Sequence, residues 1–201
     1  MKNQTLLEIR KTISPILLAG GIGVLPTDTL YGVVGSALNK KTVGRIFELR
    51  QRESDKPMII LIASLVDLKK FGIVPSPLQK KMLNVFWPGK ISVVLECQSK
   101  KFKHLHRGKN TLAFRIPADA ELQKLLKKVG PLVAPSANMS GKKPATTYSE
   151  AREYFSDNVD FYVDCGKLKS KPSTLIEMDK NGEITILRQG AVKIAKKALL
   201  R

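Results

Sequence analysis

Short apolar runs alternate with longer amphipathic segments along the whole chain of 201 residues. Most of the apolar runs are rich in β-branched residues, which is typical of strands that pack into a sheet. They predict nine strands, at 23–25, 32–36, 58–63, 91–96, 111–116, 132–134, 161–164, 173–178 and 183–187. No Pro/Gly/Ser-rich linker and no internal repeat divides the sequence, so we expect one α/β domain over residues 1–201.

Three of the intervening segments have recognisable helix starts. Asn39 precedes the segment 40–50, Ser64 is followed three residues later by Asp67, and Ser76 stands before a proline at the first helical position. The third helix carries an apolar stripe at helical spacing, which we expect to face the core: Leu78, Met82, Leu83 and Phe86.

The dipeptide Asn181-Gly182 separates the last two predicted strands. It is the strongest hairpin signal in the chain, so the sheet must contain antiparallel pairs. Alternation of strands and helices elsewhere favours a mixed sheet with helices packed on it. We therefore expect a twisted sheet of parallel and antiparallel strands.

The composition is strongly basic. Lysine and arginine number 35 against 17 acidic residues, which gives a formal net charge of +18. A field of this sign favours polyanionic partners such as tRNA or double-stranded RNA. A lysine-rich lineage that uses charge for solubility explains the same composition, so both interpretations stay open.

Two further features bear on location. The only cysteines, Cys97 and Cys165, form no zinc-binding pattern and indicate a reduced compartment. Ser14 and Pro15 interrupt the apolar run 13–18, so we expect no signal peptide. No stretch reaches the roughly 20 apolar residues that span a bilayer, and we expect no membrane contact and a cytoplasmic location.

Familiar catalytic patterns are missing from the sequence. It contains no GxxxxGK[ST], HExxH or GxSxG motif and no paired carboxylates at a catalytic spacing. The two histidines, His104 and His106, lie in the basic run 100–109, and we expect them to be solvated loop residues.

Polar segments at strand ends are the remaining candidates for chemistry. Residues 26–37 form the turn PTDTLYGVVGSA, and residues 49–57 place three cations within seven residues. Such cations suit a helix C-terminus and equally suit a triphosphate. Arg115 interrupts an apolar strand, so it must lie at a sheet edge or pair with an anion. Residues 134–141 form a hydroxyl-rich turn.

Seven short motifs follow one another along the chain: PTDTLYG, R-x-R-x-x-x-K-P, WPG, LAFRIP, PSANMSG, STLIE and ILRQG. Their types and order resemble the YrdC family, whose members include threonylcarbamoyl-AMP synthases. The resemblance implies a YrdC-like twisted sheet with a concave substrate-binding face. It also implies synthesis of threonylcarbamoyl-AMP and pyrophosphate from L-threonine, bicarbonate and ATP, for the threonylcarbamoyladenosine (t6A) modification of tRNA, with t6A transferase proteins as partners.

The same resemblance assigns residues to two subsites. The L-threonine site would consist of Thr29, Arg115, Ser173 and the backbone near Ala134. Catalytic cations around the phosphates of ATP would be Arg50, Arg52 and Lys56. The rest of the ATP site would be Thr111, Ser136, Asn138, the backbone at Pro144, and Arg188.

This chemistry needs no protein nucleophile. The neutral amine of threonine captures carbon dioxide or bicarbonate, and the resulting carbamate attacks the α-phosphorus of ATP. Positioning and charge neutralisation by cations and Mg²⁺, bound mainly through the phosphates of ATP, can support such a transfer. Asp28 is a candidate to assist the magnesium or the amine, and equally a turn-forming residue.

Two positions depart from the family pattern. Arg50 stands where the family has lysine, and Leu61 stands where many longer members have a histidine. The first change replaces a compact charge by a planar fork of donors, which affects phosphate geometry.

Two other functions remain open. A non-catalytic basic protein that binds tRNA or double-stranded RNA would use the same charge, and a YciO-like paralogue would act on another acceptor. The synthase hypothesis requires Arg115, Ser136 and Asn138 to meet in space, whereas an RNA-binding module does not.

Overall fold

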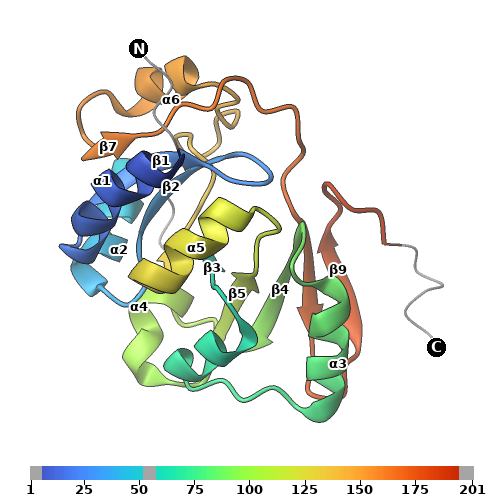
Figure 1. Cartoon of the computed structure of the whole chain (residues 1–201). Helices are drawn as coiled ribbons and strands as arrows, with labels where there is room; N and C mark the ends of the chain where they lie inside the picture. Colours follow the sequence, from blue (N-terminus) through green and yellow to red (C-terminus); the bar gives the residue numbers. More distant parts are fainter. Residues whose placement is uncertain (1–5, 52–57, 195–201) are drawn as a thin grey trace.

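Residues 6–51 and 58–194 are described by the computed structural model. Their nine strands form one mixed sheet in the order β7-β1-β2-β6-β3-β5-β4-β8-β9 (Figure 1). The strands are β1 (Ile22–Pro26), β2 (Tyr31–Ser36), β3 (Ile59–Leu61), β4 (Ile91–Glu96), β5 (Thr111–Arg115), β6 (Leu132–Val133), β7 (Phe161–Tyr162), β8 (Thr174–Met178) and β9 (Ile184–Arg188). Every predicted strand is confirmed, with small shifts at the ends.

The strand pairing confirms the mixed sheet. β1 and β2 are antiparallel, whereas β3 pairs with β5, and β4 with β8, in parallel. The predicted hairpin is also present, because β8 and β9 are antiparallel and Gly182 in their turn has φ of 81°. Glycine adopts this left-handed conformation without the steric cost that a Cβ would add.

Helices cover both faces of the sheet. They are α1 (Leu6–Leu18), α2 (Lys40–Leu49), α3 (Pro77–Phe86), α4 (Lys103–His106), α5 (Ala120–Val129) and α6 (Tyr148–Phe155), with 3₁₀ helices η1 (Leu65–Phe71) and η2 (Lys100–Phe102). Alternation along β2 separates two apolar clusters: Val34 packs with residues of α1 and α5, and Val33 with residues of α2 and α6. Figure 1 shows α1 and α5 on one side of the strands.

The three predicted helix starts are confirmed. The Asn39 side chain accepts hydrogen bonds from the backbone N–H groups of Lys41 and Thr42, as an N-cap residue does. Ser76 forms a reciprocal capping box with Gln79. Ser64 and Asp67 form another capping box, although the helix that they begin is 3₁₀ and not α.

One part of the apolar-stripe prediction is wrong. Leu83 is fully buried and Met82 and Phe86 pack against the core, but Leu78 is 48% exposed. Leu78 instead lies over the turn at Gly182, where its side chain covers the hairpin. Helical spacing identifies a face of the helix, and the far end of that face reaches beyond the sheet.

The prediction for the two histidines is also wrong. Both belong to α4, and His106 is only 3% exposed. Its Nδ1 accepts a hydrogen bond from the Gly108 N–H, and its Nε2 lies 3.3 Å from the Ser99 carbonyl oxygen. His104 is partly covered as well, and burial lowers its pKa. The basic run 100–109 therefore has apolar packing beneath its lysines.

Ser14 and Pro15 interrupt the apolar run 13–18 in the sequence, but the helix α1 continues through both residues in the structure. Pro15 lies inside the helix, and the Ser14 hydroxyl donates to the Arg10 carbonyl oxygen at 2.6 Å. Ile13 and Leu17 bury themselves against the sheet, and tertiary packing outweighs the local cost of proline. Within the described residues, no helix is long and apolar enough to cross a membrane.

Candidate functional site

A cavity of about 540 Å³ lies over β5, β4 and β8, between the β1–β2 turn and the loop that follows β6. Side chains that alternate along strands form its floor: every second residue of β5, from Thr111 to Arg115, lines it. The lining residues are Thr27, Thr29, Leu30, Tyr31, Gly32, Met58, Ile59, Val94, Lys109, Thr111, Ala113, Arg115, Ala134, Pro135, Ser136, Pro144, Pro172, Ser173, Leu175, Glu177, Leu187 and Arg188.

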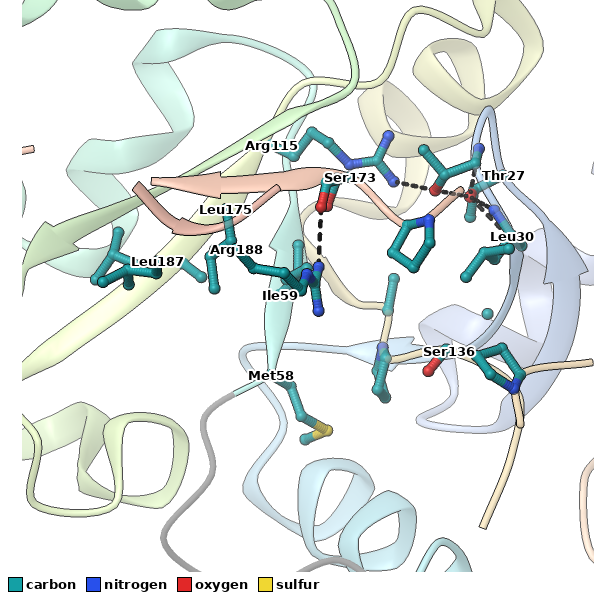
Figure 2. Close-up of a pocket in the computed structure, with 18 of the residues that line it drawn as sticks. Thr27, Leu30, Met58, Ile59, Arg115, Ser136, Ser173, Leu175, Leu187 and Arg188 are labelled. Atoms are coloured by element: carbon teal, nitrogen blue, oxygen red, sulfur yellow. Dashed lines mark hydrogen bonds between the residues drawn. The ribbon is translucent and has the colours of Figure 1, made fainter. Parts of the chain in front are cut away.

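The two ends of the cavity differ in polarity. Figure 2 shows Arg115, Ser173 and Thr27 grouped at one side, with Leu175 and Leu187 at the opposite side and Arg188 beside them. A site of this kind, apolar with a few convergent polar groups, is typical of a small-molecule pocket. The polar end, at Arg115, suits a small charged ligand. The opposite end, at Leu175, Leu187 and Arg188, suits a ligand with a flat or apolar group and an anionic group.

The polar end is built on the β1–β2 turn. The Thr27 hydroxyl accepts hydrogen bonds from the N–H groups of Thr29 and Leu30, at 3.1 and 3.2 Å, and donates to the Leu30 carbonyl oxygen. These bonds fix the turn locally, as threonine does in ST-turns. Thr29 is thereby held at the cavity wall, 5% exposed.

Arg115 is 3% exposed and lies on an interior strand, so the sheet-edge alternative is wrong and the anion alternative is confirmed. Its Nη1 pairs with the carboxylate of Asp28. Its Nη2 points to the Thr29 hydroxyl at 3.4 Å. The backbone N–H of Ala118 donates to the second oxygen of Asp28 at 3.1 Å. Asp28 thus has contacts at both oxygens.

Ser173 lies beside Arg115 and is anchored from two sides. Its hydroxyl is 2.8 Å from the hydroxyl of Ser92, which is fully buried on β4. Its carbonyl oxygen accepts a hydrogen bond from Arg188 Nη2 at 2.9 Å. Burial lowers the pKa of Arg188, and no carboxylate of the described residues pairs with this guanidinium. A partly buried cation of this kind favours an anionic ligand.

The opposite wall is the loop after β6. Ser136 donates to the Asn138 side-chain oxygen at 2.7 Å. Arg50 donates two hydrogen bonds to Asn138. Its Nε donates to the backbone carbonyl oxygen at 3.0 Å, and its Nη2 donates to the side-chain oxygen at 3.2 Å. Arg50 and Asn138 are 2% and 5% exposed, and neither lines the cavity. They hold the loop that carries Ser136 and Pro144.

The cavity therefore gathers most of the residues that the sequence proposed. The following line it: Thr29, Thr111, Arg115, Ala134, Ser136, Pro144, Ser173 and Arg188. Arg50 and Asn138 lie behind the wall, and Arg52 and Lys56 lie outside the described residues. The requirement on three residues is met in part: Arg115 and Ser136 line the same cavity, whereas Asn138 lies behind its wall and is bonded to Ser136.

Sequence reasoning missed several other lining residues. Thr27 belongs to the motif PTDTLYG, and its hydroxyl accepts hydrogen bonds from the N–H groups of Thr29 and Leu30, which stabilise the turn. Glu177 and Leu175 follow Ser173 at spacings of two, which was the available signal. Lys109 and Leu187 carry no local signal, because they reach the cavity only through tertiary contacts.

Tyr31 lines the cavity, and its hydroxyl also anchors a neighbouring segment of the chain. Its hydroxyl donates to the Gly166 carbonyl oxygen at 2.8 Å and accepts from the Cys165 N–H at 3.0 Å. Burial raises the pKa of Tyr31 well above its usual value. These bonds tie down the segment 164–173, which we call the strap and which leads from β7 to Ser173 (Figure 1).

Comparisons with known proteins agree with this geometry. The family model of Sua5/YciO/YrdC, described as telomere recombination, matches residues 15–190. The putative threonylcarbamoyl-AMP synthase of Methanocaldococcus jannaschii is 35% identical over 185 residues, which cover 90% of this chain and 86% of that protein. The threonylcarbamoyl-AMP synthase of Pyrococcus abyssi is 32% identical over 177 residues, which cover 87% of this chain and 52% of its own length.

Solved structures show the same likeness. Sua5 of P. abyssi complexed with L-threonine superimposes with a TM-score of 0.84 at 30% identity, covering 94% of this chain and 56% of that one. YciO of E. coli has a TM-score of 0.83 at 22% identity over 99% of this chain and 96% of its own, which shows a common fold. Because the family model spans most of the sequence, the chain belongs to the Sua5/YciO/YrdC family.

Proposed function

We propose that this protein is an enzyme of the nucleotidyltransferase class, an L-threonylcarbamoyladenylate synthase that serves the t6A modification of tRNA. The observation that carries the proposal is the buried guanidinium of Arg115 in the cavity, next to Thr29 and Ser173. The names of the relatives from M. jannaschii and P. abyssi support the same activity, and so does the L-threonine complex of P. abyssi Sua5.

At the polar end, the carboxylate of L-threonine would accept hydrogen bonds from Arg115, with Thr29 and Ser173 around the rest of the molecule. Arginine suits this task because its donors form a rigid planar fork that matches a carboxylate. The backbone N–H of Ala134 donates to the Ile59 carbonyl oxygen. The carbonyl oxygen of Ala134 would accept a hydrogen bond from the amine of threonine.

ATP would fill the rest of the cavity. Thr111, Ser136, Pro144 and Arg188 line that part, and Arg188 supplies a cation with no carboxylate partner in the described structure. Leu175 and Leu187 offer an apolar surface for the base. Arg50 reaches the ATP site through the loop at Asn138, and the roles of Arg52 and Lys56 at the phosphates remain part of the proposal.

In the reaction, bicarbonate takes up one proton and loses water to give CO₂. The neutral amine of threonine then bonds to the carbon of CO₂ and releases one proton, so the carbamate forms with no net change in protons. A carbamate oxygen then attacks the α-phosphorus of ATP, and the bond to the β-phosphate oxygen breaks as pyrophosphate leaves. The chain contributes orientation and positive charge, which lower the barrier without a covalent intermediate.

Magnesium enters this proposal together with ATP. The described residues contain no group of three or more His, Cys, Asp or Glu side chains that could hold a metal ion. Mg²⁺ commonly keeps its waters and binds through substrate phosphates with few protein ligands. We therefore assign it no dedicated protein cage, and it would neutralise charge on the phosphates.

The direct test is pyrophosphate release from purified protein, ATP, Mg²⁺, bicarbonate and L-threonine. We expect release only when all the substrates are present, because the carbamate must form before ATP is attacked. Threonylcarbamoyl-AMP should be detected by mass spectrometry in the same mixture. Pyrophosphate release without threonine would contradict the assigned substrate and favour a YciO-like paralogue with another acceptor.

A second property, RNA binding, is favoured by the strap. Lys167, Lys169 and Lys171 are exposed, whereas Leu168 between them packs against the core. The strap leads into Pro172 and Ser173, which line the cavity, so Lys171 is next to the lining in sequence and the other two lysines precede it along the strap. We propose that they bring tRNA, or the t6A transferase proteins that use the product, close to the site.

We expect Lys→Gln substitution of all three strap lysines to weaken tRNA binding. The slope of the logarithm of the binding constant against the logarithm of the salt concentration should become shallower by about 2–3. Filter binding at several salt concentrations measures this slope. Substitution of Lys80 and Lys81 on α3 is a control that removes charge away from the cavity. An unchanged slope in the strap variant would rule out the strap as the RNA contact.

A further inference from the structure

Asp28 and Arg115 form an ion pair that is almost completely buried. Their side chains are 7% and 4% exposed. Burying two charges costs free energy that their attraction recovers only in a good geometry with further hydrogen bonds. The pair therefore needs an explanation beyond stability, and the position of Arg115 in the cavity lining suggests one.

The guanidinium of Arg115 has a free side. Asp28 occupies Nη1, and Nη2 has only the 3.4 Å contact with Thr29. Nε is buried and has no hydrogen-bond partner in the described structure. Nε and Nη2 form the edge of the guanidinium that binds a carboxylate through two parallel hydrogen bonds. A buried, unsatisfied N–H on this edge is costly unless a ligand accepts from it.

Asp28 is itself held in place. Its second oxygen accepts from the backbone N–H of Ala118, three residues after Arg115. The carboxylate thereby joins the β1–β2 turn to the end of β5, and it fixes the direction from which it approaches the guanidinium. A flexible arginine side chain would otherwise lose rotamer freedom when the ligand binds.

Asp28 does not face the ligand directly. It is absent from the cavity lining, although its neighbours Thr27 and Thr29 belong to it. Both of its oxygens already have partners. This placement argues against a role as a ligand of the substrate amine or of magnesium, and in favour of a role that acts through Arg115.

We propose that Asp28 is a positioning residue that holds Arg115 by Nη1, so that the Nε–Nη2 edge is presented to the carboxylate of the amino-acid substrate. The proposal rests on the proposed function. Asp28 also supplies the negative charge that Arg115 needs in the empty site, and it keeps the guanidinium from binding other anions end-on. Recognition of the carboxylate thus depends on a residue outside the cavity.

The test compares L-threonine with L-threoninamide, which lacks the carboxylate, by isothermal titration calorimetry on Asp28→Asn and the original protein. We expect the preference for threonine over threoninamide to fall by about 10-fold to 100-fold in the variant, as the loss of charged hydrogen bonds implies. Affinity for threoninamide should stay nearly constant. A merely structural role would weaken both ligands alike, and that result would overturn the proposal.

Asp160→Asn is the matched control. Asp160 also pairs with an arginine, Arg45, and also accepts from a backbone N–H, that of Ile22, but it lies away from the cavity. We expect its ligand preference to equal that of the original protein. If Asp28→Asn does not fold, Asp28→Glu carries the same test, because the longer side chain displaces the anchor; full preference in Asp28→Glu would then overturn the proposal.

The outcomes separate this inference from the proposed function. If the original protein binds threonine and the Asp28 variants keep its preference, only the positioning role fails. If the original protein binds neither ligand, the threonine site itself is wrong and the inference fails with it. A selective loss of carboxylate recognition supports both.

Discussion

Substitution Arg115→Ala is expected to reduce kcat/KM for threonine by at least about 100-fold, because two or more hydrogen bonds to a charged carboxylate are lost. ATP affinity should change little, since the residues proposed for ATP lie elsewhere in the cavity. The unfolding free energy should also drop, by about 3–5 kcal/mol, because Asp28 becomes a buried charge without its partner. Steady-state kinetics and urea denaturation measure the two effects.

Arg45→Ala is the control for this experiment. Arg45 also pairs with a carboxylate, that of Asp160, but its side chain is 44% exposed. Exposed pairs contribute only about 0–1 kcal/mol, so activity and stability should stay close to those of the original protein. An equal loss of threonine and ATP affinity in Arg115→Ala would reject the division of the cavity into two subsites.

The sequence predicted the floor of the site well, because that floor follows strand periodicity. A buried arginine in an apolar strand is costly unless an anion pairs with its charge, and Asp28 is that anion for Arg115. The identity of that anion was beyond local reasoning. Asp28 lies 87 residues away in the sequence, and only the β1–β2 turn brings it to the end of β5.

The wall after β6 shows a different limit. The family resemblance implies that Arg50 lies at the phosphates of ATP, whereas the spacing of the three cations equally fits a helix C-terminus. In the structure Arg50 is fully buried and binds the backbone and side chain of Asn138, which uses the planar fork that lysine lacks. The spacing of charges in the sequence identifies candidate cations. Their burial and hydrogen-bond partners in the structure decide whether such a cation can bind a ligand or holds a loop in place.

The missed features have a common physical cause. Pro15 and the basic run 100–109 were judged from local chemistry, and in both cases apolar neighbours decide the outcome. Leu17 anchors α1 from inside the core, and Leu105 anchors α4 in the same way. A proline inside a helix costs about 3 kcal/mol, whereas burial of one isoleucine or leucine contributes about 1.5–3 kcal/mol, so Ile13 and Leu17 together offset the cost of Pro15.

Substitution Gly190→Ala is expected to damage the site from outside the cavity. A Cβ at Gly190 would lie 2.6 Å from both the carbonyl carbon and the oxygen of Ser173, in backbone that cannot give way cheaply. Either the strap or the end of β9 must move, and with it Ser173 and the Arg188 bond to its carbonyl oxygen. We expect stability to fall by about 1–3 kcal/mol, as overpacking usually costs.

Activity should fall more than stability alone explains, because Gly190→Ala displaces groups proposed for both substrates. We expect kcat/KM to drop by about 10-fold to 100-fold for threonine and for ATP together, since misplacement by 1 Å is enough for losses of this order. Gly44→Ala is the control: Gly44 lies inside α2 with nothing within 4 Å of the added Cβ, so the change should stabilise the protein by about 0.5–1 kcal/mol. If both alanine variants keep full activity, the close contact between β9 and the strap does not set the geometry of Ser173. If Gly190→Ala alone loses activity toward both substrates, that contact positions Ser173 and Arg188 together.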